Sequence, residues 1–215
     1  ECVVITEPTD LNIYRGHRGR IEIGVTTTGK ACHASAPERG KNAIYSMNKI
    51  IREIEKLNDS LAVDPFLGKG TVVVTNITCK SPSLCAVPDE CYIHLDRRLT
   101  KEETKEIAIK EIEKAAEKAG VEAKIEVLTY NLPGYKGLVY PTERYFPTWL
   151  LPEDHLLLKS SINTFNTLFD KLPVTSKWIF STNGVATMGM HKIPTIGFGP
   201  GNEQYAHSSD EHVPV

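Results

Sequence analysis

Hydrophobic and polar residues alternate along the middle of the chain with two different periods. Residues 18–28 and 90–99 switch between apolar and polar side chains, which is typical of strands with one buried face. Apolar residues from Ala43 to Leu57 recur at intervals of three and four, which predicts an amphipathic helix. Residues 71–78 are rich in valine and threonine and predict a further strand.

A second helix is expected after the strand at residues 90–99. Thr100 is expected to be its N-cap residue, and Glu103, three residues later, would complete a capping box. Gly120 is expected to end the helix. A closing strand is expected over residues 123–129. The order from residue 18 onward is therefore β-α-β-β-α-β, which predicts a ferredoxin-like unit: a four-stranded antiparallel sheet with two helices on one face.

The segments on either side of this unit predict a second layer. Its strands are expected at residues 2–6, 177–180 and 194–198, and its helix at residues 152–170, with Pro152 in the first turn. The connection from Tyr130 to Leu151 is expected to be a long loop rich in proline and aromatic residues, placed either to line a pocket or to link two parts.

Chain order therefore predicts an α/β fold with two domains. We expect a discontinuous α/β domain of residues 1–15 and 131–215, into which a ferredoxin-like domain of residues 16–130 is inserted.

Composition narrows the classes of partner. With 25 basic and 27 acidic residues the formal net charge is −2, so charge gives no reason to expect nucleic acid or an anionic membrane. No apolar run approaches the roughly 20 residues needed to cross a bilayer. RNA-binding modules that share the βαββαβ order stack bases on aromatic side chains, and residues 71–78 contain none, so RNA binding is not expected.

The five cysteines are an odd number without a CxxC pair. This argues against a disulfide scaffold and for a reducing compartment, so we expect a cytoplasmic protein. Cys79, Cys85 and Cys91 recur at equal spacing but lack the close pairing of a zinc site, and we expect them to be buried structural thiols.

Two residues at the ends of predicted strands are candidates for chemistry. His207 follows a loop shaped by Gly197, Gly199 and Gly201, and Glu7 stands at the end of the first strand. Ligands often bind at the carboxyl ends of strands in α/β folds, so either side chain could hold a metal or carry a proton. The alternatives are an ordinary loop histidine and a solvated turn carboxylate.

Three blocks of sequence, in order, carry a resemblance to a known family. They are Glu7-Pro-Thr9; Gly16-His-Arg-Gly19 with His33-Ala-Ser-Ala-Pro-Glu-Arg-Gly-Lys-Asn-Ala43; and Ser181-Thr-Asn-Gly184 with Gly197-Phe-Gly-Pro-Gly201 and Ala206-His207. With these blocks the whole chain resembles the di-zinc aminoacylase-type metallopeptidases, which include acetylornithine deacetylase, succinyl-diaminopimelate desuccinylase and the glutamate carboxypeptidases. Details look closest to a subgroup named selenium metabolism hydrolase.

The resemblance implies a zinc-peptidase catalytic domain with a ferredoxin-like lid that dimerises, and two zinc ions per complete active site, with cobalt or manganese as alternatives. A zinc-activated water would cleave the amide bond of a peptide or an N-acyl amino acid. The roles implied are Glu7 and His207 as ligands to different zinc ions, His33 as an oxyanion donor in the partner subunit's site, Arg98 for a substrate carboxylate, and Asn183, Gly199 and Gly201 as the pocket lining.

The chain also departs from the family pattern. The upstream half of the family carries a metal-binding histidine, a bridging aspartate and the glutamate pair that supplies the general base, and none of these is present. Cys85, not asparagine, precedes Ala86-Val87-Pro88. The sequence therefore looks like the C-terminal part of a longer enzyme. The alternatives are a non-catalytic dimerisation module and a ferredoxin-like domain that senses a small molecule.

Overall fold

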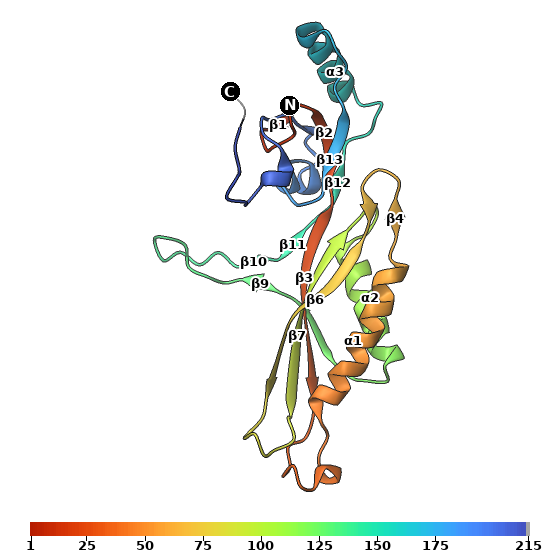
Figure 1. Ribbon diagram of the computed structural model, residues 1–215, viewed down its shortest axis with the longest axis vertical. Helices are drawn as coiled ribbons and strands as arrows, with labels where there is room; N and C mark the ends of the chain where they lie inside the picture. The colour runs from red at the N-terminus through yellow and green to blue at the C-terminus, as the bar shows by residue number, and fades with distance from the viewer. Residues whose placement is uncertain (214–215) are drawn as a thin grey trace.

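The protein is described from a computed structural model, which covers residues 1–213. The molecule is elongated, with one lobe at each end of its long axis (Figure 1). The helices are α1 (Ala43–Ser60), α2 (Lys105–Lys118), α3 (Leu156–Phe169), the π-helix η2 (Val185–Met190) and the 3-10 turns η1 (Pro37–Arg39) and η3 (Glu203–Tyr205).

The lower lobe is built on the sheet that the alternating segments predict. Its strands are β3 (Gly19–Thr28), β6 (Thr71–Lys80), β7 (Glu90–Leu99) and β8 (Lys124–Val127), in the order β8-β3-β7-β6 with every pairing antiparallel. Helices α1 and α2 cover one face, and the inward side chains of β3 and β7 are fully buried against them. This is the predicted ferredoxin-like fold, and we call it the lid.

The upper lobe contains a mixed sheet of short strands. They are β1 (Val3–Ile5), β2 (Ile13–His17), β12 (Trp149–Leu150), β13 (Thr175–Trp178) and β14 (Thr195–Gly197). The order is β1-β14-β2-β12, and β13 also pairs with β2. The pairs β1–β14 and β13–β2 are parallel, while the other two are antiparallel. Helix α3 packs on this sheet through Leu158 and Phe165, which gives the predicted α/β class.

Two predicted helix starts are wrong. Thr104, not Thr100, caps α2, because Glu102 adopts a left-handed φ of 67° and interrupts the turn. Glu103 does accept a hydrogen bond from the Thr100 N–H, at 2.7 Å, but it does so ahead of the helix. Helix α3 begins at Leu156, and its cap is the His155 side chain, which accepts from the Leu157 N–H.

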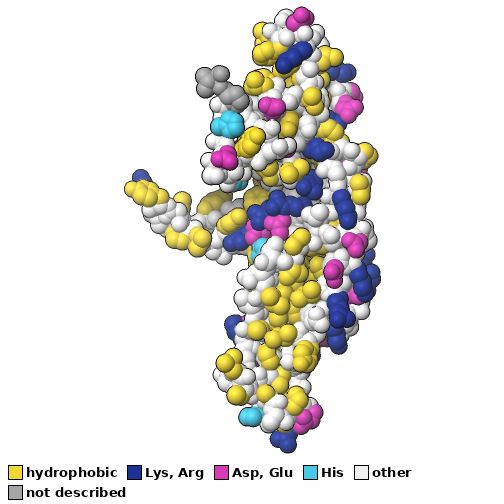
Figure 2. Space-filling model, in the orientation of Figure 1, with side chains coloured by type: hydrophobic (Ala, Val, Ile, Leu, Met, Phe, Trp, Pro, Cys, Tyr) yellow, Lys and Arg dark blue, Asp and Glu magenta, His cyan; other side chains and the backbone are white. Residues whose placement is uncertain are grey.

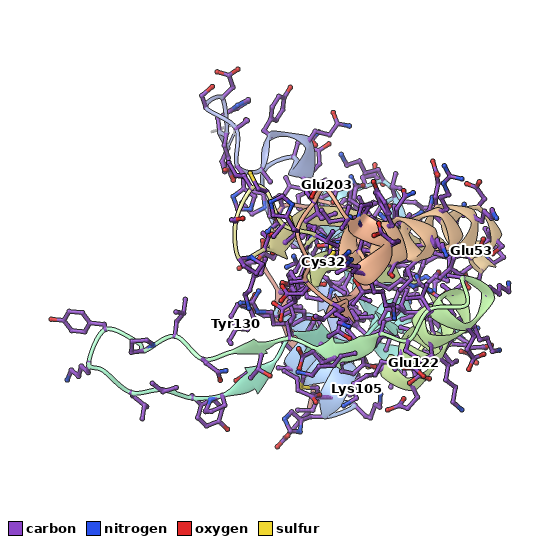
Figure 3. All side chains as sticks on the ribbon, turned by 90° about the horizontal axis from the view of Figure 1, so that it is seen from below. Cys32, Glu53, Lys105, Glu122, Tyr130 and Glu203 are labelled. Atoms are coloured by element: carbon purple, nitrogen blue, oxygen red, sulfur yellow. The ribbon has the colours of Figure 1, made fainter. Side chains whose placement is uncertain are left out.

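The segment predicted as a long loop contains ordered strands. Strand β9 (Thr129–Tyr130) pairs with β10 (Thr142–Glu143), and β11 (Tyr145–Phe146) pairs with β3. Residues 130–143 form a hairpin, which we call the arm. It stands away from both lobes (Figure 1) and begins near Tyr130 (Figure 3).

Two of the three equally spaced cysteines are not buried. Cys91 lies in the core, but Cys79 and Cys85 are exposed, so the expectation of buried thiols is wrong for them. Cys79 lies in the edge strand β6, in which every residue from Thr75 to Lys80 is exposed, and Cys85 lies in the connection from β6 to β7. Within the described residues, no helix is long and apolar enough to cross a membrane.

A buried ion cluster joins α2 to the lid sheet. The fully buried Arg97 guanidinium contacts Glu103 at 2.5 Å and Glu111 at 2.9 Å. Both carboxylates are largely shielded from water, so each depends on this one cation.

We expect Arg97→Ala to lower the free energy of unfolding by about 3 kcal/mol, because it leaves two shielded carboxylates without a counter-charge. Urea titration of the purified chain measures this change. Arg52→Ala, at an exposed position of α1, is the matched control and should change stability by less than about 0.5 kcal/mol. A loss below about 1 kcal/mol for Arg97→Ala would contradict the dependence of these carboxylates on Arg97.

Candidate functional site

Glu7 and Asn183, which lie far apart in sequence, line the same hollow. Two adjoining cavities share these residues. One measures about 470 Å³ and is otherwise lined by residues 3–8 of β1 and the segment after it. The other measures about 600 Å³ and is also lined by Arg20, by residues of the arm base and β11, and by the turn and π-helix after β13. We call this pair of cavities the candidate site.

Gly199 and Gly201 hold the segment that carries Glu7. Gly199 accepts a hydrogen bond from the Thr9 N–H and its own N–H donates to the Thr9 hydroxyl. A Cβ at Gly199 would lie 2.4 Å from the carbonyl oxygens of Thr6 and Glu7, so only glycine fits. Gly201 has a φ of +79° and accepts from the Asp10 N–H. Both glycines therefore act through the backbone, and neither is among the residues that line the two cavities.

The turn that presents Asn183 is fastened by a buried histidine. Nδ1 of His17 accepts the Thr182 N–H at 2.9 Å, and Nε2 lies 3.4 Å from the Pro147 carbonyl. Burial lowers the pKa of His17 to about 4, although the contact with Pro147 opposes this shift, so the ring is neutral at pH 7. Gly184 follows, where a Cβ would overlap the Trp149 ring. Asn183 itself stays exposed to the cavity.

His207 lies on the loop after β14. It is exposed, has a left-handed φ of 63°, and its N–H donates to the Glu211 carboxylate at 3.0 Å. Within residues 1–213, no group of three or more histidine, cysteine, aspartate or glutamate side chains gathers in a way that could hold a metal ion. Structural and catalytic zinc sites take three or four protein ligands, and residues 1–213 bring no such set together.

Glu203 is a further carboxylate of this loop that sequence reasoning missed. One of its oxygens is buried and has no hydrogen-bond partner among the described residues. Burial raises the pKa of Glu203, although Lys177 opposes the rise. Its place four residues before His207 was the only sequence signal available.

Arg98 belongs to a charged network on the face of the lid that no helix covers. Arg98 and Arg20 lie opposite each other in β7 and β3, and both bond to Asp96 at 2.7 Å. Glu22 continues the network through Arg20, His94 and Arg144. Figure 2 shows basic and acidic side chains gathered where the two lobes meet.

This network holds more positive than negative charge. Hydrogen bonds from Arg144 and His94 outweigh burial and keep the pKa of Glu22 below its usual value. Arg18, next to the network, donates to the backbone carbonyls of Lys69 and Ile179, and burial and the charge of Arg98 lower its pKa. Such a surface favours an anionic ligand.

Arg20 is the arginine of this network that lines the candidate site. Sequence reasoning missed it, although its position opposite Arg98 in two alternating strands was a usable signal.

His33 lies far from Glu7 in this chain. It is carried by the connection between β3 and α1, at the lower end of the molecule, whereas β1 lies in the upper lobe (Figure 1). His33 is exposed, and its Nδ1 accepts the Ser35 N–H at 3.1 Å. The proton of a neutral ring therefore sits on Nε2, which makes Nε2 a hydrogen-bond donor.

About half of the chain matches a known protein family. A family described as "Peptidase dimerisation domain", of the M20 peptidases, matches residues 15–124 of the 215-residue chain. The chain belongs to the M20 peptidase family. This confirms the family resemblance that the three sequence blocks carry, while the subgroup stays a prediction.

Curated relatives extend the similarity beyond the matched segment. The uncharacterised protein YgeY of Escherichia coli (strain K12) is 52% identical over 211 residues, which are 98% of this chain and 52% of that protein. An acetylornithine deacetylase of Salmonella arizonae is 26% identical over 224 residues, covering 99% of this chain and 52% of that enzyme. The chain thus spans about half the length of the curated relatives it matches.

Solved structures share the fold at low sequence identity. The aminopeptidase PepT of Bacillus cereus superposes with a TM-score of 0.70 at 16% identity, covering 98% of this chain and 51% of that one. The M20 metallo-carboxypeptidase Sso-CP2 of Sulfolobus solfataricus gives a TM-score of 0.64 at 16% identity, with coverages of 98% and 59%.

We expect His17 to make the M20 chain less stable in acid. Its folded pKa of about 4 lies below the unfolded value of 6.5, so between these pH values only the unfolded state takes up the proton. The contribution to the free energy of unfolding should fall by about 3 kcal/mol from pH 7 to pH 4.

The measurement is urea unfolding at several pH values for the wild type and His17→Gln. Their difference in stability should shrink with falling pH, whereas His191→Gln, at an exposed histidine, should show no such trend. A pH-independent difference for His17→Gln would refute the neutral, buried ring.

Proposed function

We propose that this chain supplies the lid and part of the active site of a metal-dependent hydrolase that cleaves the amide bond of a peptide or an N-acyl amino acid. The observation that carries the proposal is the candidate site, where Glu7, Asn183 and Arg20 meet. A carboxylate, an amide and a guanidinium in one hollow suit a polar, anionic substrate next to a metal.

The proposal assigns the metal to a polypeptide with the full length of the relatives. There, Glu7 and His207 would each hold one of two zinc ions, with cobalt or manganese as alternatives, and the remaining ligands and the general base would come from outside this chain. The metal would supply an activated water. We also propose the domain division, with residues 16–130 as the lid and residues 1–15 and 131–215 as part of the catalytic domain.

Substrate recognition is assigned to the lid arginines. Arg98 would hold the substrate carboxylate, and the excess positive charge of its network supports that role. Asn183 would contact the substrate from the opposite lobe. Gly199 and Gly201 would shape the pocket by fixing the segment of Glu7.

His33 would act as an oxyanion donor in the partner subunit's site. Its separation from Glu7 within one chain and its Nε2–H donor support this assignment. The partner would be a second copy of this chain, joined through the lid.

The dimer is proposed to form along β6. This strand ends the lid sheet. The Val72 N–H on its outer edge bonds to Asn58, the edge beyond it faces no further strand among the described residues, and Val73 and Ile77 are about half exposed. Exposed apolar edge strands pair with other chains.

The five free cysteines support a reducing, cytoplasmic location.

The decisive experiment is hydrolysis and metal analysis in a polypeptide of full relative length. We expect hydrolysis of N-acyl amino acids or short peptides that a chelator abolishes. His207→Ala should lose about half of the bound metal or more, because it removes one of few ligands. His33→Ala should keep its metal and lower kcat about 100-fold, as for the loss of one oxyanion donor.

Mixed dimers test the role of His33 across the interface. A dimer of one Glu7→Gln subunit and one His33→Ala subunit would contain one intact site if His33 acts in the partner, and it should recover about half of the wild-type activity. If His33 acted within its own chain, every site would stay damaged and no activity would return.

Unchanged metal content in His207→Ala would refute its ligand role.

A separate experiment tests whether the dimer forms along β6. Ile77→Lys, in the exposed edge of β6, should raise the dimer dissociation constant at least tenfold, or about 1.4 kcal/mol, because charge on an edge strand opposes pairing. Sedimentation equilibrium of the 215-residue chain measures this constant. Val63→Lys, on the exposed strand β4 (Val63–Asp64), is the matched control, and equal constants for both variants would rule out the β6 interface.

A further inference from the structure

The arm is an apolar element whose side-chain contacts with the rest of the described chain lie at its base, where Arg144 stacks on Tyr130 and Lys105 bonds to Glu143. All residues from 130 to 143 are exposed, and the side chains of Leu132, Tyr135 and Tyr140 are 81%, 100% and 78% exposed. Between residues 131 and 142 the only charged side chain is Lys136. The arm lies outside the segment that matches the peptidase dimerisation domain, so the family match gives it no role.

The arm nevertheless has a defined backbone. Thr142 pairs with Tyr130, Pro133 bridges to Val139, and the Gly134 N–H donates to the Leu138 carbonyl at 2.8 Å. Gly137, with a φ of +79°, closes the turn. An isolated two-stranded hairpin is at best marginally stable in water, so this arm needs a surface to pack on.

We propose that the arm packs on a second copy of this chain and forms part of the dimer interface. The inference rests on the proposed dimer along β6. Tyrosine-rich, exposed apolar segments are typical of the central contacts in protein interfaces.

The geometry of the lid sheet supports a second copy of this chain as the partner that the arm contacts. Antiparallel pairing of two β6 edges places the twofold axis perpendicular to the joined sheet, so the faces without helices merge into one surface. Arg20 and Glu22, at the root of the arm, lie on that face, and the arm stands off the side opposite the helices (Figure 1). Both arms of a dimer therefore rise from the same surface.

The reach of the arm fits this arrangement. Its root strand β11 pairs with β3 on the side away from β6, which places the root three strand spacings, or about 14 Å, from the β6 edge. Each leg of the hairpin, from Tyr130 to the turn, spans about 18 Å at about 3.3 Å per residue. The arm is long enough to extend past its own sheet edge to the partner.

The area that the β6 edge can bury is too small for a stable dimer, so a second part of the chain must contribute to the interface. A stable interface buries about 800 Å² on each partner, whereas one strand edge offers a strip about 33 Å long and about 5 Å wide. Burial of Tyr135 and Tyr140 alone would add roughly 300 Å² or more per subunit. The two leucines of the arm, Leu132 and Leu138, add further apolar area.

The test compares two arm variants with a control in the 215-residue chain. In the first, Asn-Gly replaces residues 131–141 and joins Tyr130 directly to its partner Thr142 as a two-residue hairpin. In the second, Tyr135→Ser and Tyr140→Ser keep the hairpin intact. Leu156→Ser, at an equally exposed leucine of α3, is the control. Circular dichroism checks that each variant is folded.

We expect both arm variants to raise the dimer dissociation constant at least tenfold, the control to change it less than twofold, and arm amides to exchange more slowly in the dimer than in the monomer. A wild-type dimer that Ile77→Lys weakens but both arm variants leave unchanged would overturn the role of the arm and keep the β6 interface. A chain that stays monomeric at all concentrations would overturn both.

Discussion

Two chain segments cross from one sheet to the other, and the rest of the architecture depends on their close contact. Strands β2 and β3 are one nearly continuous run from Ile13 to Thr28, and β11 and β12 return antiparallel to it. At the crossing a Cβ on Gly16 would lie 2.8 Å from the Trp149 carbonyl, and one on Gly19 would lie 2.6 Å from the Phe146 carbonyl. Only glycine permits this approach.

The crossing also sets the composition of the candidate site. It brings Arg20, Tyr145 and Phe146 of the lid side to the same cavity as the turn that carries Asn183. His17, at the end of β2, fastens that turn through Thr182. The same few residues therefore join the lobes and shape the cavity, so a change in the angle between lobes would change the distance between Arg20 and Glu7.

The periodic parts of the fold could be predicted from sequence because one buried face determines them. Helix α1 and strands β3, β6 and β7 were found, since their core positions repeat at regular intervals. Strand β2 was missed because Arg15 and His17 are buried as polar groups, satisfied by Leu151 and Thr182, which are distant in sequence. The early start given to α2 failed for a related reason, since Glu103 serves the buried Arg97 in place of the helix end.

The candidate site was predictable only in its outline, because its partners are brought together by folding. Strand-end positions indicated Glu7 and His207 and the family resemblance indicated Asn183, whereas the strand register that sets Arg20 opposite Arg98 and beside this cavity appears only in the fold. The arm shows a second limit of prediction from sequence, because its composition suggests the wrong environment. Its tyrosines and leucines look like a core segment by composition, yet the described chain offers them no core. An isolated hairpin with exposed apolar side chains is marginally stable in water, and the proposed dimer would supply the surface that covers this one.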